Sequence, residues 1–170
     1  IIGNDNDGKL LKKLMKDVGI SDAGIVVDRK RPTTAKTRVI ANNQHVVRID
    51  KEKTHPISAN TEKNILLILK KEIKKLDAII LQDYNKGVLT KSLIEKVIAL
   101  ANENKKIVTV DPKFNNFFSY QNVTVFKPNR KETEDAFGTR IKTVEDVTGA
   151  GTKLLEGLKC KYALLTLGED

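Results

Sequence analysis

The alternation of apolar and polar positions predicts helices and strands in a regular order after residue 58. Two amphipathic helical stretches, around 65–73 and 93–101, each precede a short β-branched run. A third such run is followed by a short helix and by a longer helix near 143–159. The four strands are expected at 78–81, 107–110, 123–126 and 163–167. Strands alternating with helices of this length are typical of a parallel sheet with right-handed crossovers, so the pattern predicts an α/β fold.

An additional helix is predicted near the start of the chain. Asp7 is a suitable N-cap for it, and Gly19 is expected to end it. Its apolar residues recur at helical spacing on one face: Leu10, Leu11, Leu14, Met15 and Val18.

Residues 33–50 change to the pattern of a β-hairpin. Two β-rich runs meet at Asn42-Asn43, where asparagine tolerates the left-handed geometry of a tight turn. Alternation places Lys36 and Arg38 on one face of the first strand, and Arg48 adds a cation on the second. A hairpin with mixed cationic and apolar positions suits an anionic ligand or a second copy of the chain, whereas the alternative is a solvated hairpin. The expected division is an α/β core from 1–32 and 51–170 and a small β-hairpin from 33–50.

Polar and charged residues crowd the carboxyl ends of all four predicted strands. The sequences that follow the strands are QDYNKG, DPK, KPNRKE and GED. Because ligands bind at this edge of an open α/β sheet, we expect a binding site there. Lys86, Lys113 and Lys127 can supply the cations that position an anionic ligand there.

The turn after the third strand is the most informative single segment. Lys127 precedes a proline and therefore closes the strand, Asn129 is a natural helix N-cap, and Glu132 follows three residues later. A helix N-terminus at a strand end favours phosphate, and an amide with a carboxylate can hold Mg²⁺ through water. A plain turn stabilised by a capping box is the alternative interpretation.

Composition narrows the class of ligand. The 170 residues carry a net charge of +9, but the lysines are spread over every predicted helix, and aromatic residues are only 5%. This distribution disfavours nucleic acid and favours phosphorylated small molecules. A single cysteine, Cys160, and the lack of a long apolar run indicate a cytoplasmic protein with no membrane segment. Both ends of the sequence look cut from a longer chain.

Several segments together resemble the ribokinase-type sugar kinases, also called the phosphofructokinase B family. GNDNDG at 3–8 is similar to the GxDxxG segment of that family, NRKE at 129–132 to its NxxE motif, and TLGED at 166–170 to its nucleotide-contacting T-x-G segment. Within the family, RPTTAKTRVIANNQHVVRID, LQDYNKGVLT, VDPK and KPNRKE resemble the heptose 7-phosphate kinases. The similarity extends over essentially the whole chain, which contains no P-loop motif.

This resemblance implies a ribokinase-like doubly wound sheet with helices on both faces, and a lid hairpin that commonly forms a homodimer. It implies ATP and Mg²⁺ as cofactors and a phosphorylated sugar as substrate. Nucleotide binding would fall to Asn129, Arg130, Lys131, Glu132, Thr166, Gly168 and Glu169, with Glu132 meeting the metal through water. Sugar-phosphate binding would fall to Lys36, Arg38, Arg48, Asp83, Tyr84, Lys86 and Lys113.

The catalytic aspartate of this family lies in a GAGD motif, and the sequence departs from that pattern. DVTGAGT at 146–152 has threonine in place of the aspartate and precedes the TLGED segment instead of following it. Thr143 and Asp146 predict a capping box and a helix running through these glycines. We therefore expect the catalytic aspartate to lie beyond Asp170. Alternatives are a different sugar kinase of the same fold, or a binding module that does not catalyse.

Overall fold

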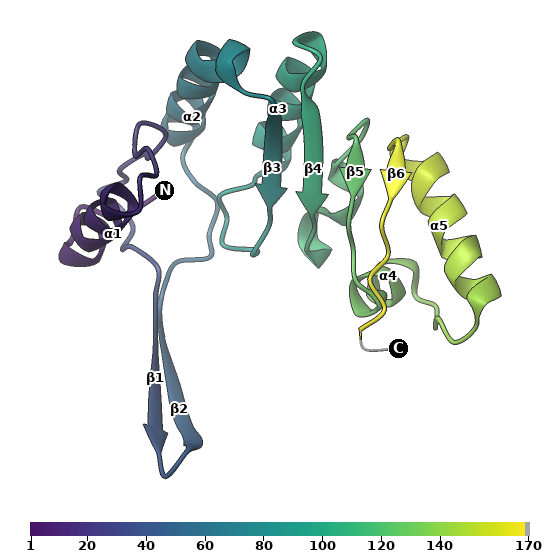
Figure 1. Ribbon diagram of the computed structural model, residues 1–170, viewed down its shortest axis with the longest axis horizontal. Coiled ribbons are helices and arrows are strands. Elements are labelled where there is room, and N and C mark those ends of the chain that lie inside the picture. Colours follow the sequence, from purple (N-terminus) through teal and green to yellow (C-terminus); the bar gives the residue numbers. More distant parts are fainter. Residues whose placement is uncertain (169–170) are drawn as a thin grey trace. The chain divides into compact units, whose positions relative to one another are not determined.

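The computed structural model describes residues 1–168, which divide into two compact units. Unit 1 comprises residues 1–68 and 86–88, and unit 2 comprises residues 69–85 and the chain from residue 89 (Figure 1). The elements of unit 1 are α1 (Asn6–Asp17), β1 (Ala35–Ala41), β2 (Gln44–Lys51) and the first turns of α2 (Ala59–Glu72). Among the described residues, no helix has the length and apolar character needed to cross a bilayer.

Helix α1 is capped by Asp5, so the prediction of Asp7 as the cap is wrong. Asp5 has an extended backbone, and its carboxylate accepts a hydrogen bond from the Gly8 amide at 2.9 Å. The same carboxylate accepts hydrogen bonds from the backbone amide of Thr33 at 2.9 Å and from its hydroxyl at 2.6 Å. The local pattern could not reveal these distant donors. Asp7 lies in the first turn and forms an ion pair with Lys51 instead.

The apolar face of α1 is exposed in the part of the chain that the structure describes. Leu10 is 54% exposed, Leu14 is 52% exposed and Val18 is 70% exposed. The amphipathic pattern therefore predicted the helix correctly, but these side chains do not enter the core formed by residues 1–168.

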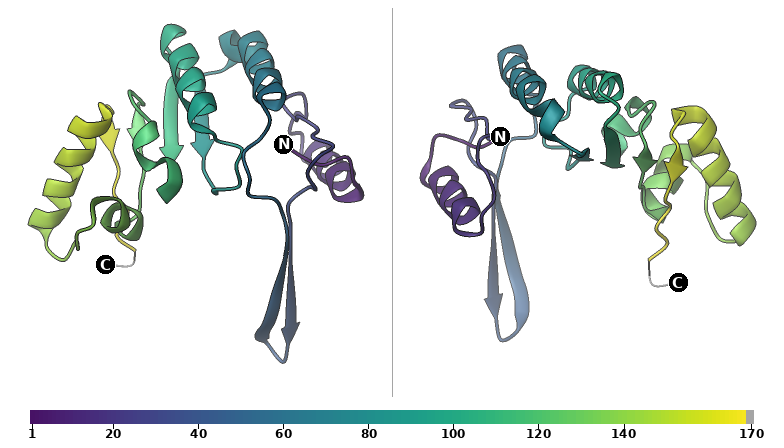
Figure 2. Two further views of the ribbon diagram at one scale, coloured as in Figure 1. Left: turned by 180° about the vertical axis from the view of Figure 1, so that it is seen from behind. Right: turned by 45° about the horizontal axis from the view of Figure 1, so that its top comes forward.

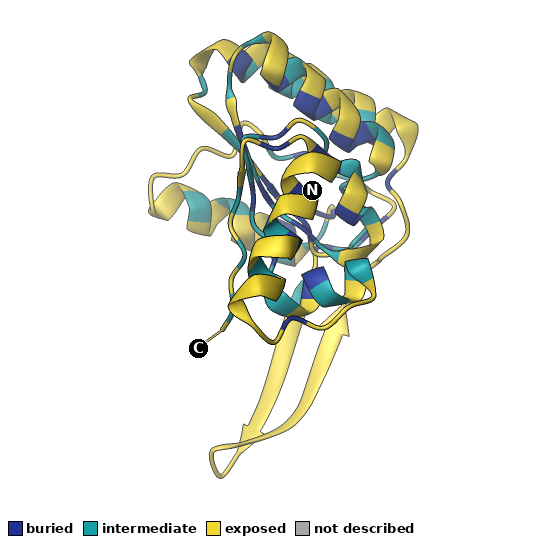
Figure 3. Ribbon diagram, turned by 90° about the vertical axis from the view of Figure 1, so that its right-hand side faces the viewer, coloured by how far each residue is buried: buried dark blue, intermediate teal, exposed yellow. Residues whose placement is uncertain are grey.

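The hairpin of β1 and β2 follows the prediction closely. Asn42 and Asn43 both have positive φ, at 49° and 61°, as the tight turn requires. The two strands are antiparallel, and their register shifts at a bulge between Val39 and Ile40. The hairpin is exposed along almost its whole length (Figure 3).

Unit 2 is built on a parallel four-stranded sheet in the order β3-β4-β5-β6. Its remaining elements are η1 (Ile73–Lys75), β3 (Ala78–Gln82), α3 (Lys91–Glu103), β4 (Ile107–Asp111), η2 (Phe114–Ser119), β5 (Val125–Phe126), α4 (Arg130–Phe137), α5 (Val144–Leu158) and β6 (Tyr162–Ala163). The predicted α/β architecture is confirmed. The last two strands are shorter than predicted, because only two residues of each join the ladder.

One face of this sheet carries the core of unit 2. Val108, Val110 and Phe126 are almost completely buried, and α3 covers this side of β3 and β4 (Figure 2). Phe117 of η2 packs edge-on against Phe126 with ring centroids 5.1 Å apart. Alternate residues point to the opposite face, where Ile80 is 72% exposed.

Candidate functional site

The carboxyl ends of three strands in unit 2 are joined by polar contacts. The Asp111 carboxylate at the end of β4 accepts a hydrogen bond from Gln82 of β3 at 2.6 Å. The ammonium of Lys127, which follows β5, lies 3.3 Å from the same carboxylate. The predicted gathering of polar residues at this edge is therefore confirmed within unit 2.

Asn129 and Glu132 form the predicted capping box at the start of α4. The Asn129 side chain accepts a hydrogen bond from the Glu132 amide at 2.8 Å, and the Glu132 carboxylate accepts one from the Asn129 amide at 2.9 Å. Glu132 is only 8% exposed. The box fixes the carboxylate at the positive end of the helix dipole, directly at the edge of the sheet.

The second oxygen of the Glu132 carboxylate contacts the ammonium of Lys113, which follows β4. This hydrogen bond raises the pKa of Lys113 above its ordinary value. Lys113 is therefore charged at neutral pH and held at the start of α4. The structure thus brings together one residue predicted to bind the sugar phosphate and one predicted to serve the nucleotide.

Thr166 lies beside the capping box of Asn129 and Glu132. Its amide donates to the Pro128 carbonyl at 3.0 Å, and its carbonyl accepts from the Arg130 amide at 2.8 Å. Thr166, Gly168 and Lys131 are exposed. The predicted Glu169 lies outside the described residues.

Asp83 is the most enclosed of the predicted site residues. It is 3% exposed, and its carboxylate accepts hydrogen bonds from the Tyr120 hydroxyl at 2.7 Å, the Asn85 amide at 2.8 Å and the Asn116 side chain at 3.3 Å. Burial, together with the contact to Asp83, raises the pKa of Tyr120. These partners give Asp83 a structural role, and its contact with a sugar hydroxyl stays a prediction. Its neighbour Tyr84 is 65% exposed.

The hairpin of unit 1 places cations on one face. The register pairs Arg38 directly with Arg48, and Lys36 with Asp50. Opposed arginines repel one another, so an anion between them would relieve an unfavourable pair. The opposite face carries the pairs Thr37–Ile49 and Val39–Val47, which give it an apolar character.

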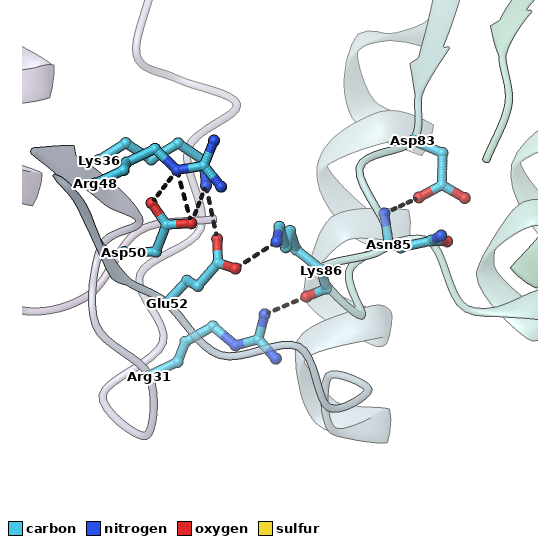
Figure 4. Close-up of polar contacts among 8 residues, drawn as sticks. All are labelled: Arg31, Lys36, Arg48, Asp50, Glu52, Asp83, Asn85 and Lys86. Carbon is cyan, nitrogen blue, oxygen red and sulfur yellow. Dashed lines mark hydrogen bonds and ion pairs between the residues drawn. The ribbon is translucent and has the colours of Figure 1, made fainter. Parts of the chain in front are cut away.

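Ion pairs connect the cationic face to the loop at residues 86–88 (Figure 4). Asp50 contacts Arg48 at 2.9 Å and Lys36 at 3.1 Å. Glu52 lies 3.4 Å from Lys36 and also contacts the Lys86 ammonium. Arg38 forms no ion pair with any described residue.

A magnesium ion would find a limited set of protein ligands here. Among residues 1–168, no three acidic, histidine or cysteine side chains gather into a metal-binding group. Mg²⁺ commonly uses one or two carboxylates together with substrate phosphates and water. Both oxygens of Glu132 already accept hydrogen bonds, so Glu132 fits a role through water rather than direct coordination.

The glycines of DVTGAGT lie inside helix α5, as predicted. Thr143 and Asp146 form a capping box that begins this helix. The Thr152 hydroxyl donates to the Thr148 carbonyl at 3.1 Å, one turn back along the helix. The segment therefore provides no loop of free backbone amides and no carboxylate at its last position.

Comparison with known proteins identifies the family. Residues 1–170 match the model described as pfkB family carbohydrate kinase. The chain belongs to this family. It is 37% identical over 170 residues to the bifunctional protein HldE of Helicobacter pylori strain J99, and 38% identical to that of Geobacter metallireducens. The chain is covered completely, but it spans only 37% and 35% of the length of these relatives.

Solved structures of ribokinases have a similar fold. A ribokinase from Giardia lamblia has a TM-score of 0.73 and 18% sequence identity, and the match covers 98% of this chain and 51% of that one. Ribokinase from Arabidopsis thaliana, solved in complex with ribose and ATP, has a TM-score of 0.69 and 16% identity, covering 98% and 53%. The chain therefore has the ribokinase-like α/β fold that was predicted.

The contacts around the hairpin define a cluster, here called the hairpin cluster: Arg31, Lys36, Arg38, Arg48, Asp50, Glu52 and Lys86. The sequence did not single out two of these residues, Arg31 and Glu52. Arg31 is buried and donates to two backbone carbonyls, while Glu52 connects two of the predicted lysines. Arg31 opens the segment RPTTAKTRVIANNQHVVRID and Glu52 lies just after it, but neither residue type at these positions points to a contact with Lys86. Only the tertiary contacts distinguish these residues from ordinary loop charges.

Proposed function

We propose that the chain is the kinase region of an enzyme that transfers the γ-phosphate of ATP to heptose 7-phosphate. The observation that carries the choice of a phosphorylated sugar is the direct pairing of Arg38 with Arg48 on an exposed face. Arginines bind phosphate through paired, charge-assisted hydrogen bonds. The similarity to HldE along the whole chain, and the heptose-kinase segments of the sequence, support the choice of heptose.

In this proposal the hairpin cluster binds the sugar substrate, and the residues at the strand ends of unit 2 bind the nucleotide. Arg38, Arg48, Lys36 and Lys86 bind the phosphate of the sugar. Asn129, Glu132 and Thr166 serve the nucleotide, with Glu132 orienting water on Mg²⁺ when Mg-ATP is bound. Mg²⁺ supplies electrostatic stabilisation of the transferred phosphoryl group.

The base that accepts the proton of the attacking hydroxyl is proposed to lie beyond Asp170. Thr152 cannot act as that base, because an alcohol is far too weakly acidic to exist as its anion near neutral pH, and its hydroxyl is engaged inside α5. A protein limited to these 170 residues should therefore release no ADP. We propose that the full-length enzyme acts in the cytoplasm, where ATP is available.

The hairpin is also proposed to join two copies of the enzyme. Its apolar face exposes Val39, Val47 and Ile49 by 41%, 49% and 58%. Pairing these faces would bury them in a homodimer. Replacing Val47 by Glu should shift the full-length protein from dimer to monomer in analytical ultracentrifugation, whereas an unchanged mass would contradict the proposal.

The decisive experiment measures ADP release by the full-length protein with Mg-ATP and a panel of sugars. Heptose 7-phosphate should give the highest kcat/KM, well above fructose 6-phosphate and ribose, and chelation of Mg²⁺ should abolish turnover. A higher kcat/KM for another sugar would identify a different kinase of the same fold. Binding of ATP and sugar phosphate without turnover would instead support a non-catalytic module.

A further inference from the structure

Lys86 is restrained both at its backbone and at its ammonium group by residues to which the sequence assigned no role. Its ammonium contacts the carboxylate of Glu52, and its backbone carbonyl accepts a hydrogen bond from Arg31 Nη1 at 3.1 Å (Figure 4). These three residues belong to unit 1. A flexible lysine is therefore restrained both at its backbone and at its charged group.

The backbone restraint centres on the buried side chain of Arg31. This residue is 8% exposed, and its Nη2 donates to the His55 carbonyl at 2.7 Å. One planar guanidinium thus bridges the carbonyls of residues 55 and 86, a geometry that lysine cannot reproduce.

Gly87 allows the two segments to approach this closely. Its φ is +71°, and a Cβ built at this position would lie 2.1 Å from the His55 carbonyl oxygen. The Gly87 carbonyl also accepts a hydrogen bond from the Ile57 amide at 2.9 Å. The loop at 86–88 is therefore fixed against residues 55–57 with little freedom to move.

Glu52 restrains the other end of Lys86 and couples it to the hairpin. Its carboxylate contacts Lys86 and also accepts a hydrogen bond from Lys36 of β1 at 3.4 Å, and its side chain is only 14% exposed. The hydrogen bond from Lys86 is the main reason that the pKa of Glu52 is lowered, so Glu52 is charged at neutral pH. Two ammonium groups from separate segments thus converge on one carboxylate.

The charges of this cluster leave it attractive to an anion. Lys36, Arg48 and Lys86 supply three positive charges, while Asp50 and Glu52 supply two negative ones. Arg38 adds a further cation on the same face of the hairpin. A carboxylate in such a site opposes anion binding by its charge, and it can favour binding only by holding the cations in place.

We propose that Glu52 and Arg31 are positioning residues, which hold Lys36 and Lys86 at the spacing needed to bind the phosphate of the sugar substrate. This inference rests on the proposed function of the hairpin cluster. It assigns neither residue a contact with the reacting atoms.

Replacement of Glu52 by Gln separates positioning from simple charge. The variant removes a negative charge from the cluster, so electrostatics alone predicts a lower KM for the phosphorylated sugar. Positioning predicts the opposite, because both lysines lose their common partner. We expect the KM for heptose 7-phosphate to rise about tenfold, the effect of weakening a charge-assisted hydrogen bond to phosphate. The KM for ATP and kcat should change little.

The experiment uses the full-length protein with Glu72→Gln as its matched control. Glu72 also pairs with a lysine, Lys75 at 2.8 Å, but this pair lies in unit 2, on α2 and η1. The control changes the net charge equally and should leave both KM values unaltered. Glu52→Asp should restore part of the sugar KM, since it keeps the charge. A sugar KM that falls or stays constant in Glu52→Gln would overturn the inference.

Two further measurements keep the outcome clear. Arg31→Lys should raise the sugar KM in the same way if the variant folds, which circular dichroism verifies. Titration of the wild type and Glu52→Gln with inorganic phosphate, followed by NMR of the lysine side chains, tests anion binding without turnover. Weaker phosphate binding by Glu52→Gln would support the inference even if heptose 7-phosphate were not the substrate. Equal or tighter binding by that variant, or no binding by the wild type, would refute it.

Discussion

Replacing Glu132 by Gln provides the sharpest test of the nucleotide-binding role proposed for Asn129, Glu132 and Thr166. Glutamine keeps one oxygen that can accept the Asn129 amide, so the capping box can persist. The loss is the charged contact with Lys113, whose side chain is 36% exposed and partly screened by solvent. A hydrogen bond to a charged group contributes about 1.5–3 kcal/mol, so we expect the lower end of this range here. Loss of a negative charge at the helix N-terminus adds about 0.5 kcal/mol, giving a total near 2 kcal/mol.

Glu134→Gln is the matched control, because it lies in the same helix with the same kinds of partner. Its carboxylate accepts a backbone hydrogen bond from Ile141 at 2.8 Å and pairs with Arg140 at 3.1 Å. It differs by lying two residues further along α4, away from the helix N-terminus. Both variants should lose stability, so stability alone cannot separate a structural carboxylate from a catalytic one.

Turnover separates the two interpretations. If Glu132 orients water on the magnesium of Mg-ATP, its replacement should lower kcat about 10–100-fold, the typical cost of losing an outer-shell partner of a metal. Glu134→Gln should keep the wild-type kcat. Urea denaturation gives the stability loss and steady-state ADP release gives kcat, both on the full-length protein. Equal kcat values in the two folded variants would refute the nucleotide role and leave Glu132 as a helix cap.

Three further outcomes test other parts of the molecule. Arg38→Ala should raise the KM for the sugar phosphate while leaving that for ATP unchanged, at a cost of roughly 1.5–3 kcal/mol in binding, and equal effects on both substrates would make the hairpin purely structural. Hydrogen bonds from the hydroxyl and amide of Thr33 lower the pKa of Asp5 from 3.8 to about 2, so its contribution to stability is complete above pH 3.8 and is lost as the pH falls towards 2. In Asp5→Asn the free energy of unfolding should therefore depend less on pH between these two values, as measured by urea denaturation at several pH values. An unchanged pH dependence would contradict this assignment. Thr152→Ala should leave kcat intact, since its hydroxyl donates to the Thr148 carbonyl within α5, whereas loss of turnover would show that DVTGAGT takes part in catalysis.

Local sequence signals predicted the elements whose determinants lie within a few residues. The Asn42-Asn43 turn, the capping box of Asn129 and Glu132, and the helix through DVTGAGT all depend on short-range geometry, and all are confirmed. The order of strands and helices was predicted from the spacing of apolar residues along the chain. The same periodicity predicted helix α1 but does not say what its apolar face packs against, and in the described residues that face is exposed.

Long-range contacts account for the residues that the sequence could not assign. Asp5, and not Asp7, is the N-cap of α1, because Thr33, far along the chain, donates two hydrogen bonds that hold the Asp5 carboxylate in place. Glu52 and Arg31 matter only because the loop at Lys86 folds back on them. The register that opposes Arg38 and Arg48 depends on the bulge after Val39, which alternation alone does not locate.

The order of strands in unit 2 has a consequence for the way the protein is made. Each strand of β3-β4-β5-β6 pairs with the strand that follows it in the chain. The sheet can therefore grow in one direction as the polypeptide leaves the ribosome, because each new βα segment meets a partner that has already emerged. The five-residue pairing of β3 with β4 can form first and template the two-residue pairings of β5 and β6. The contact between Asn129 and Thr166 can therefore form only after β6 has been synthesised.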